Sequence, residues 1–291
     1  MSRSRRRATA VATALAMALA SGFAGGWFVR GSVGAGEPPA QAAGTSAVVT
    51  AQPVGVGARG CPSPRRITTL PGTAPTVALT FDDGPSEDTT SAILAILAAK
   101  GVRATFFETG EHASSHPQLV ADVVAGGHAV GSHSWNHPRL TELTAAQVAD
   151  QLDRSNAAVS AAAGTRLCLM RPPFGLTNRA VDGIIDALGL TQVGWTHNPK
   201  DWLNPTPEQL RRDSAPWPGS PPTILLLHEH GREDVQQVGP SPTVAALPHI
   251  IDDYVAAGYT FVQTSGRPFP RDGARPGAET SERQAAGWAS S

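Results

Sequence analysis

The sequence has no excess of charge of either sign. Its 291 residues include 23 lysines and arginines and 24 aspartates and glutamates, which gives a formal net charge of -1. Proteins that bind nucleic acid or an anionic membrane surface electrostatically carry a strong positive field, and this balance does not produce one. We therefore expect no nucleic acid or other polyanion among the partners.

Cysteine is also scarce, since Cys61 and Cys168 are the only two in the chain. In an oxidising compartment they can form a disulfide, but their spacing leaves open the alternative of two unrelated buried thiols. A glycine fingerprint for nucleotide binding is missing too. Gly84, which follows the first strand-like apolar run, precedes Pro85 instead of a G-x-x-G run, so this position does not support a dinucleotide-binding sheet.

The N-terminal end resembles an export segment. Four arginines at positions 3, 5, 6 and 7 precede an uncharged, alanine-rich stretch over residues 8–29. The stretch is long enough to span a bilayer, and a small-x-small cleavage pattern at residues 18–20 lies inside it rather than after it. A cleaved signal peptide and a membrane anchor over residues 1–30 both stay open, with the anchor slightly favoured. The arginines would hold that end in the cytoplasm and place the rest outside.

The rest of the chain divides into a long middle part between two stretches of low apolar content. Residues 31–74 are rich in Gly, Ala, Pro, Ser and Thr and cannot bury enough surface to order themselves, which predicts a flexible linker. Residues 266–291 are similar and predict a disordered tail. Residues 75–265 have the size of one domain, and a chain with 41% hydrophobic residues can build a sizeable core.

Within residues 75–265, apolar runs of strand length alternate with segments whose apolar residues recur at helical spacing. We predict strands at residues 76–81, 103–107, 128–131, 166–170, 191–195, 223–227 and 259–262, and helices at 89–99, 117–125, 145–163, 178–188, 207–213 and 242–257. Repeated strand-helix units imply parallel strands joined by right-handed crossovers. This α/β pattern predicts a closed or nearly closed barrel, with an open doubly wound sheet as the alternative.

Polar residues gather directly after the predicted strands, where the reactive groups of parallel α/β folds meet. They are Asp82 and Asp83 after the first strand, His133 and His137 after the third, Arg171 after the fourth, His197, Asn198 and Asp201 after the fifth, and His228, Glu229 and His230 after the sixth. We therefore consider them together as one candidate site.

Two histidines and a carboxylate suggest a metal site. His133 and His137 would share one face if residues 133–137 coil into a helical turn, and both would then reach one cation. A catalytic zinc site needs three protein ligands and an open position for water, and Asp82 or Asp83 would be the third. Each feature alone has a simpler explanation, since such histidines are usually surface or core residues and an acid pair can be a solvated turn. Their combination at neighbouring strand ends favours the metal.

The remaining polar residues fit the proton transfers of a hydrolysis. A metal-bound water has a pKa near neutrality, and the second aspartate would accept its proton while Arg171 pairs with that base. His228 is placed like a general acid for the leaving group, with Asp201 orienting it and favouring its charged form. Arg171 and His228 each have a structural alternative, a salt bridge and a hydrogen bond respectively. For His197 and His230 a structural role is the simpler explanation.

Five short motifs, in order along the chain, resemble those of a known family. They are TFDDGP at 80–85, HSWNH at 133–137, RPPFG at 171–175, DW at 201–202 and LLH at 226–228. Residues 75–265 thereby look like a polysaccharide deacetylase of the NodB-homology group, carbohydrate esterase family four. The resemblance implies a distorted (β/α)7 barrel and a divalent metal, usually zinc. It also implies removal of acetyl groups from amino sugars in glycans such as peptidoglycan or chitin.

Carried over by position, the resemblance implies a role for each residue. It implies Asp83, His133 and His137 as metal ligands, Asp82 as the general base paired with Arg171, and His228 as the general acid tuned by Asp201. The main-chain N–H of Phe174 would help to stabilise the oxyanion. Trp202 and Leu226 would form the pocket around the acetyl methyl group.

Three positions depart from the family pattern. Asn198 stands where many members have an acid, Glu229 followed by His230 replaces a common Asp, and Phe174 replaces a common Tyr. None of these positions is a metal ligand, base or acid. We therefore expect activity to be retained, with room for a shift in substrate preference.

We expect a monomeric, extracytoplasmic deacetylase of N-acetylated cell-envelope polysaccharide, secreted or held by an N-terminal membrane anchor. The nearest alternative is an O-acetyl esterase acting on acetylated xylan or a similar glycan, since the same site attacks either acyl bond. A catalytically silent glycan-binding module is a further alternative. Such a module would be expected to have lost a ligand or the base, and all are present here.

Overall fold

The computed structural model describes residue 61 and residues 66–217, 219–229 and 241–269, all within the compact unit of residues 52–291. The predicted signal or anchor at residues 1–30 lies outside the described residues, as do most of the predicted linker and tail. Among the described residues, no helix is both long enough and apolar enough to cross a membrane.

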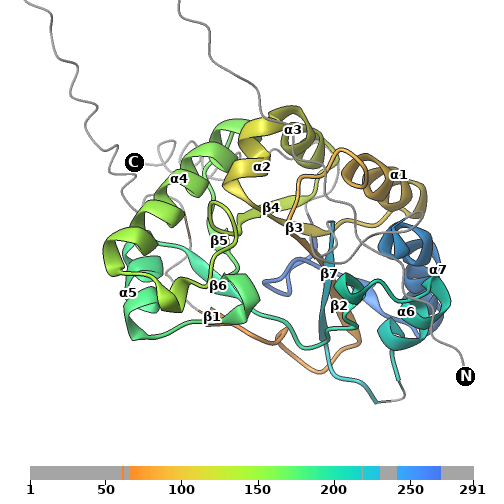
Figure 1. Ribbon diagram of the computed structural model, residues 1–291. Helices are drawn as coiled ribbons and strands as arrows, with labels where there is room; N and C mark the ends of the chain where they lie inside the picture. The colour runs from red at the N-terminus through yellow and green to blue at the C-terminus, as the bar shows by residue number, and fades with distance from the viewer. Residues whose placement is uncertain (1–60, 62–65, 218, 230–240, 270–291) are drawn as a thin grey trace, which may run out of the picture. The chain divides into compact units, whose positions relative to one another are not determined.

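Parallel strands form a sheet at the centre of the unit (Figure 1). They are β1 (Arg66–Ile67), β2 (Thr76–Asp82), β3 (Thr105–Glu108), β4 (Ala129–Ser132), β5 (Leu169–Met170), β6 (Thr191–Val193), β7 (Thr223–His228) and β8 (Thr260–Phe261). Their order is β1-β6-β5-β4-β3-β2-β7, and β8 pairs with the beginning of β2. Every pair of strands is parallel, as the alternation of strands and helices predicts.

The chain just after β6 joins the two sides of this sheet. His197 forms a bridge with Leu225 of β7, and Thr196 donates its main-chain N–H to the carbonyl oxygen of Ile224. These contacts bring the β6 side of the sheet onto β7, so the strands close into a distorted barrel with the helices outside it (Figure 1). The predicted α/β fold class is confirmed, and the closure favours the barrel over the open sheet.

The helices of the described residues match the prediction closely, with one addition. They are α1 (Thr90–Lys100), α2 (Gly110–Ser115), α3 (Pro117–Ala125), α4 (Ala145–Ala163), α5 (Arg179–Ala187), α6 (Pro207–Ser214) and α7 (Pro242–Ala256). The bounds of α4 were predicted correctly because strong signals define both ends. Thr144 and Gln147 form a capping box at its start, and Gly164 ends it in the left-handed conformation. The short α2 was missed because it spans too few residues to show helical periodicity.

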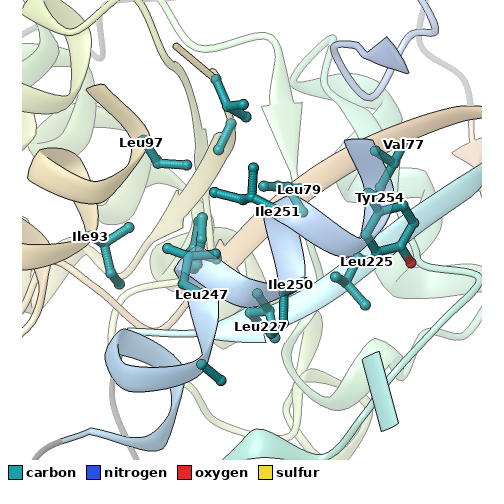
Figure 2. Close-up of a cluster of buried hydrophobic side chains, with 14 of the residues drawn as sticks. Val77, Leu79, Ile93, Leu97, Leu225, Leu227, Leu247, Ile250, Ile251 and Tyr254 are labelled. Atoms are coloured by element: carbon teal, nitrogen blue, oxygen red, sulfur yellow. The ribbon is translucent and has the colours of Figure 1, made fainter. Parts of the chain in front are cut away.

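A buried cluster packs β2 and β7 against the helices outside the barrel. It includes Val77, Leu79 and Phe81 of β2, Leu225 and Leu227 of β7, Ile93 and Leu97 of α1, and Leu247, Ile250, Ile251 and Tyr254 of α7 (Figure 2). The α7 residues share one face because they recur at spacings of three and four. Each such side chain contributes roughly 1.5–3 kcal/mol by leaving water. The cluster therefore holds firmly the two strands that end in Asp82 and His228.

The other face of β2 points into the barrel. Side chains alternate along a strand, so Thr80 and Asp82 lie opposite the apolar series. Both are buried and both contact the same interior residue, Arg171. The strand periodicity that buries one face of β2 therefore also directs a carboxylate into the barrel.

The folded domain begins before the predicted boundary at residue 75. Arg66 and Ile67 pair with β6, and Ile67 and Leu70 are buried in a small apolar cluster. A disulfide also joins Cys61 to Cys168, as the cysteine content allowed. Residues 66–74 therefore belong to the domain rather than to a linker. The sequence pattern missed β1 because a two-residue strand with one apolar residue has no readable period.

Candidate active site

The polar residues predicted at the strand ends meet at one end of the barrel. Asp82 ends β2 and lies in register with His228 at the end of β7. His133 follows β4 and Arg171 follows β5. Since the strands are parallel, these ends all open on the same side. Asp201 begins the short 3-10 helix η3 (Asp201–Leu203) and reaches His228 from there.

Asp83, His133 and His137 form a possible metal-binding group, and it is the one such group found among the described residues. Asp83 Oδ1 lies 3.4 Å from Nε2 of His133 and 3.5 Å from Nε2 of His137. The three ligand atoms all lie within 4.8 Å of one another. They therefore surround a point from which a cation would contact all three at ligand distances of about 2 Å.

The two histidines meet through an irregular loop and not through the helical turn expected from their spacing. Residues 133–137 contain no helix, and Ser134 and His137 adopt positive φ angles of 68° and 58°. The expectation of a helical turn was therefore wrong, although the expectation that both rings reach one point was right. Backbone conformations of this kind are not encoded by residue spacing.

The chemistry of the three side chains fits a divalent metal. Asp83 Oδ1 is buried and has no hydrogen-bond partner, an arrangement that a cation would satisfy. The Nδ1 of His133 donates to the carbonyl oxygen of Arg171 at 2.6 Å, which directs Nε2 of the same ring toward Asp83 and the metal position. Burial is the main cause that lowers the pKa of His137 to about 4. The His137 ring is therefore neutral at physiological pH and can act as a ligand.

Asp83 itself stays ionised. Burial opposes its charge, but the close contact with His133, with smaller contributions from His228 and His137, outweighs burial and holds the pKa of Asp83 below its usual range. The backbone of Asp83 has a φ of 72°, which turns its side chain away from the direction of the β2 series. Adjacent carboxylates therefore face different groups.

Asp82 is bound by an arginine inside the barrel. Its Oδ1 accepts a 2.6 Å hydrogen bond from Arg171 Nη1, which also contacts the hydroxyl of Thr80. Other nitrogens of Arg171 donate to the carbonyl oxygens of Val193 and Gly194. The Arg171 side chain is 0% exposed, so Asp82 supplies the charge that offsets a fully buried cation. The pairing predicted from sequence is confirmed as a contact, and Asp82 Oδ2 is left facing His133 at 3.6 Å.

His228 is held by Asp201. Its Nδ1 and main-chain N–H both bond to the Asp201 carboxylate, each at 2.7 Å, and the hydroxyl of Thr243 donates to the same carboxylate at 2.8 Å. Burial disfavours the charged ring, but the charge and hydrogen bond of Asp201 outweigh burial and raise the pKa of His228 to about 9. The ring therefore carries a proton at neutral pH. Thr243 has no motif around it, and the sequence offered no signal for it.

The expected pocket residues lie on the same side of the barrel. Leu226 is buried in β7. Trp202 follows Asp201 in η3 and is partly buried. Phe174 is 49% exposed, and its ring lies 4.5 Å from the ring of His137 and 4.6 Å from the guanidinium carbon of Arg139. Phe174 therefore lies beside the metal-binding group at the molecular surface.

Several polar residues near the strand ends have structural contacts. Asn198 Oδ1 accepts the main-chain N–H of Lys200, which stabilises the turn before η3. His197 bonds to the carbonyl oxygen of Asp213, consistent with the structural role expected for it. His230 lies outside the described residues.

Two buried acids lie next to Gly84, the residue after Asp83, and one of them was not predicted. Glu108 ends β3 and Glu229 follows β7, and both are almost fully buried. A side chain at Gly84 would collide with both carboxyl groups, so only glycine fits at this position beside the acids. Burial, together with the neighbouring charge of Glu229, raises the pKa of Glu108 well above its usual range, and burial raises the pKa of Glu229 to about 7. An acid directly after the apolar residues of β3 was the signal for Glu108.

A closed parallel barrel with a metal-binding group, a charged histidine and a separate carboxylate at its strand ends defines a class of protein, the metal-dependent hydrolases. Comparison with known families narrows this class. The family model for polysaccharide deacetylase matches residues 70–193. A chitooligosaccharide deacetylase of Bradyrhizobium sp. (strain ANU 289) is 32% identical over 191 residues, which cover 63% of this chain and 86% of that protein. The chain belongs to the polysaccharide deacetylase family.

Two further comparisons give the extent of the likeness. The peptidoglycan-N-acetylglucosamine deacetylase of Listeria monocytogenes serotype 1/2a (strain 10403S) is 40% identical over 126 residues, 43% of this chain but only 26% of that protein. The solved family 4 carbohydrate esterase from Streptomyces lividans, in complex with acetate, is 31% identical with a TM-score of 0.60. That match covers 69% of this chain and 100% of the esterase chain, so the likeness spans a whole catalytic domain.

Proposed function

We propose that this protein is an extracytoplasmic, metal-dependent deacetylase that removes acetyl groups from N-acetylated amino sugars of a cell-envelope polysaccharide. The observation that carries the proposal is the arrangement of Asp83, His133 and His137 beside Asp82 and His228. A chitooligosaccharide and a peptidoglycan deacetylase are among the similar proteins, and both names describe hydrolysis of an N-acetyl group on a glycan.

The proposed mechanism divides the work among these residues. A divalent cation, for which we propose zinc, would lower the pKa of water and polarise the acetyl carbonyl when held by Asp83, His133 and His137. Asp82, paired with Arg171, accepts a proton from the attacking water. Water adds its oxygen to the acetyl carbon, and the main-chain N–H of Phe174 bonds the carbonyl oxygen as it gains negative charge.

His228 completes the reaction. It enters the reaction charged because Asp201 raises its pKa to about 9, and it donates its proton to the amine nitrogen as the carbon-nitrogen bond breaks. The products are acetate and a free amino sugar. Trp202 and Leu226 form the proposed apolar pocket for the acetyl methyl group, and their positions in η3 and in β7 are compatible with that role.

The setting of the enzyme is part of the proposal. The arginine-rich start and the apolar stretch at residues 8–29 support export, followed by cleavage or anchorage at the membrane. The disulfide between Cys61 and Cys168 is also suited to an oxidising compartment. We propose that the protein acts as a monomer.

The competing activity is an O-acetyl esterase acting on acetylated xylan or a similar glycan. The charged state of His228 favours the deacetylase, because an amine leaving group needs protonation more than an alkoxide does. His228→Ala should therefore lose more activity on an amide than on an ester of the same glycan. An equal loss on both substrates would argue against this assignment.

The test of the function is acetate release by the zinc-loaded protein from chitooligosaccharide, peptidoglycan and acetylated xylan, with chelated protein as the control. We expect release from the N-acetylated glycans and its loss on chelation. Release from xylan alone would support the esterase. No release from any substrate by a folded, zinc-bound protein would support the silent binding module instead.

A further inference from the structure

The loop that carries the two histidine ligands has a strained backbone. Ser134 and His137 both have positive φ angles, 68° and 58°, a region that residues other than glycine adopt at a cost of order 1–3 kcal/mol each. Such a conformation persists only if surrounding contacts select it. Within the loop, Ser134 Oγ accepts the main-chain N–H of His137 at 3.1 Å. This bond involves neither Trp135 nor Asn136, so the loop itself does not hold these two residues.

Gln151 of α4 provides that support from outside the loop. Its Oε1 accepts two successive main-chain N–H groups, from Trp135 at 3.0 Å and from Asn136 at 3.3 Å. Its Nε2 donates to Oδ1 of Asn136 at 2.9 Å. One amide side chain therefore uses both ends to hold the two residues that separate Ser134 from His137.

Other residues of α4 hold the same segment. Ser155, four residues after Gln151, exchanges a hydrogen bond of 2.9 Å with Ser132, the residue before His133. The guanidinium of Arg154 lies 4.0 Å from the centre of the Trp135 ring. Positions 151, 154 and 155 share a helix face, and Val148 and Leu152 anchor α4 in the apolar core. Gln151 is thus presented to the loop by a helix that cannot easily shift.

We propose that Gln151 is a positioning residue of the metal site: through its three hydrogen bonds it holds the loop in the conformation that brings His133 and His137 onto the same cation as Asp83. The inference rests on the proposed function only in taking these three residues as the ligands. Replacing a residue that orients metal ligands typically lowers metal affinity by about 10- to 100-fold. In the variant, part of the free energy of metal binding is used to order the loop.

The test measures zinc affinity of the full-length folded protein by competition with a chromophoric chelator. Gln151→Met keeps the length and helix propensity of the side chain but has no strong hydrogen-bonding group, and we expect it to bind zinc about 10- to 100-fold more weakly. Gln151→Glu keeps an oxygen that can accept both main-chain N–H groups, and we expect an affinity within about threefold of the parent protein, since only the bond from Nε2 to Oδ1 of Asn136 is lost. Gln118→Met is the matched control, because Gln118 lies on α3 and, within the described part of the chain, its side chain bonds to the exposed side chain of Asp122.

The outcomes separate a positioning role from a structural one. A folded Gln151→Met protein with parental zinc affinity overturns the proposal, as does a lower unfolding free energy of the metal-free protein with no change in affinity. If Gln151→Met does not fold, Gln151→Asn replaces it, because the shorter amide stays polar but cannot reach both N–H groups. Parental affinity in that variant would equally overturn the proposal.

The readout of this test is zinc binding, so its result is independent of acetate release. A protein whose zinc affinity depends on Gln151 but that deacetylates nothing would refute the proposed function alone.

Discussion

Asp82 and Asp83 are adjacent in the chain but contact different groups. Asp82 continues the inward series of β2 and bonds to Arg171, whereas the positive φ of Asp83 turns its carboxylate to the two histidines. Two adjacent carboxylates in a solvated turn would repel each other. Here Asp82 faces a cation, and Asp83 faces the two histidines of the possible metal-binding group. These contacts are compatible with the proposed division of labour, with Asp83 as metal ligand and Asp82 as base.

Replacement of each aspartate should therefore have a different signature. Asp83→Asn should lose bound zinc and activity together. Asp82→Asn should retain zinc and lower kcat by about 10² to 10⁴, the usual size of a proton-transfer role. Metal content and acetate release are measured on protein whose folding has been checked, since Asp82→Asn leaves Arg171 with a buried, unbalanced charge. An Asp82→Asn protein that folds but has lost its zinc would contradict the assignment of Asp83 as the ligand.

The pH dependence of activity should report the pair of His228 and Asp201. Asp201 raises the pKa of His228 to about 9, so activity that needs the charged ring falls as pH rises through that region. Asp201→Asn removes the charge, lowers the pKa of His228 and should move the alkaline limb of the kcat/KM profile to lower pH. Asp253→Asn is the control, because Asp253 pairs with Arg211 at the protein surface. An alkaline limb that stays in place in folded Asp201→Asn would show that another group sets it.

β3 and β4 are joined at their beginnings by a titratable residue. His128 Nδ1 accepts the main-chain N–H of Ala104 at 3.1 Å, at the start of β3. Burial, together with the positive charge of Arg103, lowers the pKa of His128 from 6.5 to about 4. In the fold the ring must stay neutral, because its Nδ1 lone pair is already used as an acceptor.

The stability of these two strands should consequently decline in acid. Below pH 6.5 the unfolded chain protonates His128 while the folded protein does not, until pH falls to about 4. The free energy of unfolding therefore falls as pH drops through this window, by on the order of 3 kcal/mol at most from this group. His128→Asn keeps an acceptor near Nδ1 without titrating, so it should lose this part of the dependence. Urea unfolding at pH 7.5 and 4.5 measures it, and identical pH dependence in both proteins would contradict the role of His128.

Elements with strong local signals were predicted to within a residue or two, and those without were not. α3 begins with Pro117, which is favoured in the first turn of a helix, and its predicted bounds match the structure. β5 was predicted over residues 166–170, but only Leu169–Met170 pair with neighbours. Apolar character marks a segment as buried, whereas the length of a strand depends on which neighbouring strand is available for hydrogen bonding.

The disulfide acts on the molecule as a whole. It joins Cys61, before β1, to Cys168, before β5, across a sequence separation of 107 residues. A link over so long a loop restricts the unfolded chain, and its loss typically costs about 2–5 kcal/mol. Cys168→Ser should lower the free energy of unfolding by that amount in urea titrations. Cys61→Ser should have the same effect, and the double variant should be no worse than either single one. Additive losses would indicate two independent thiols.

The sequence by itself determined the fold class and most of the site. Alternating strand-like and helical periods are local properties, and five ordered motifs carry the proposed ligands, base and acid at strand ends, where a parallel fold must bring them together.

The tertiary structure alone decided how these residues are held. Thr243 reaches Asp201 across 42 positions, Gln151 reaches Trp135 across 16, and Glu108 meets Glu229 only because β3 and β7 flank β2. Each of these contacts joins two separate segments of the chain, and the residue pattern within either segment does not predict it. Residue type likewise does not predict the left-handed backbone at Asp83, Ser134 and His137. It is selected by contacts with the surrounding tertiary structure.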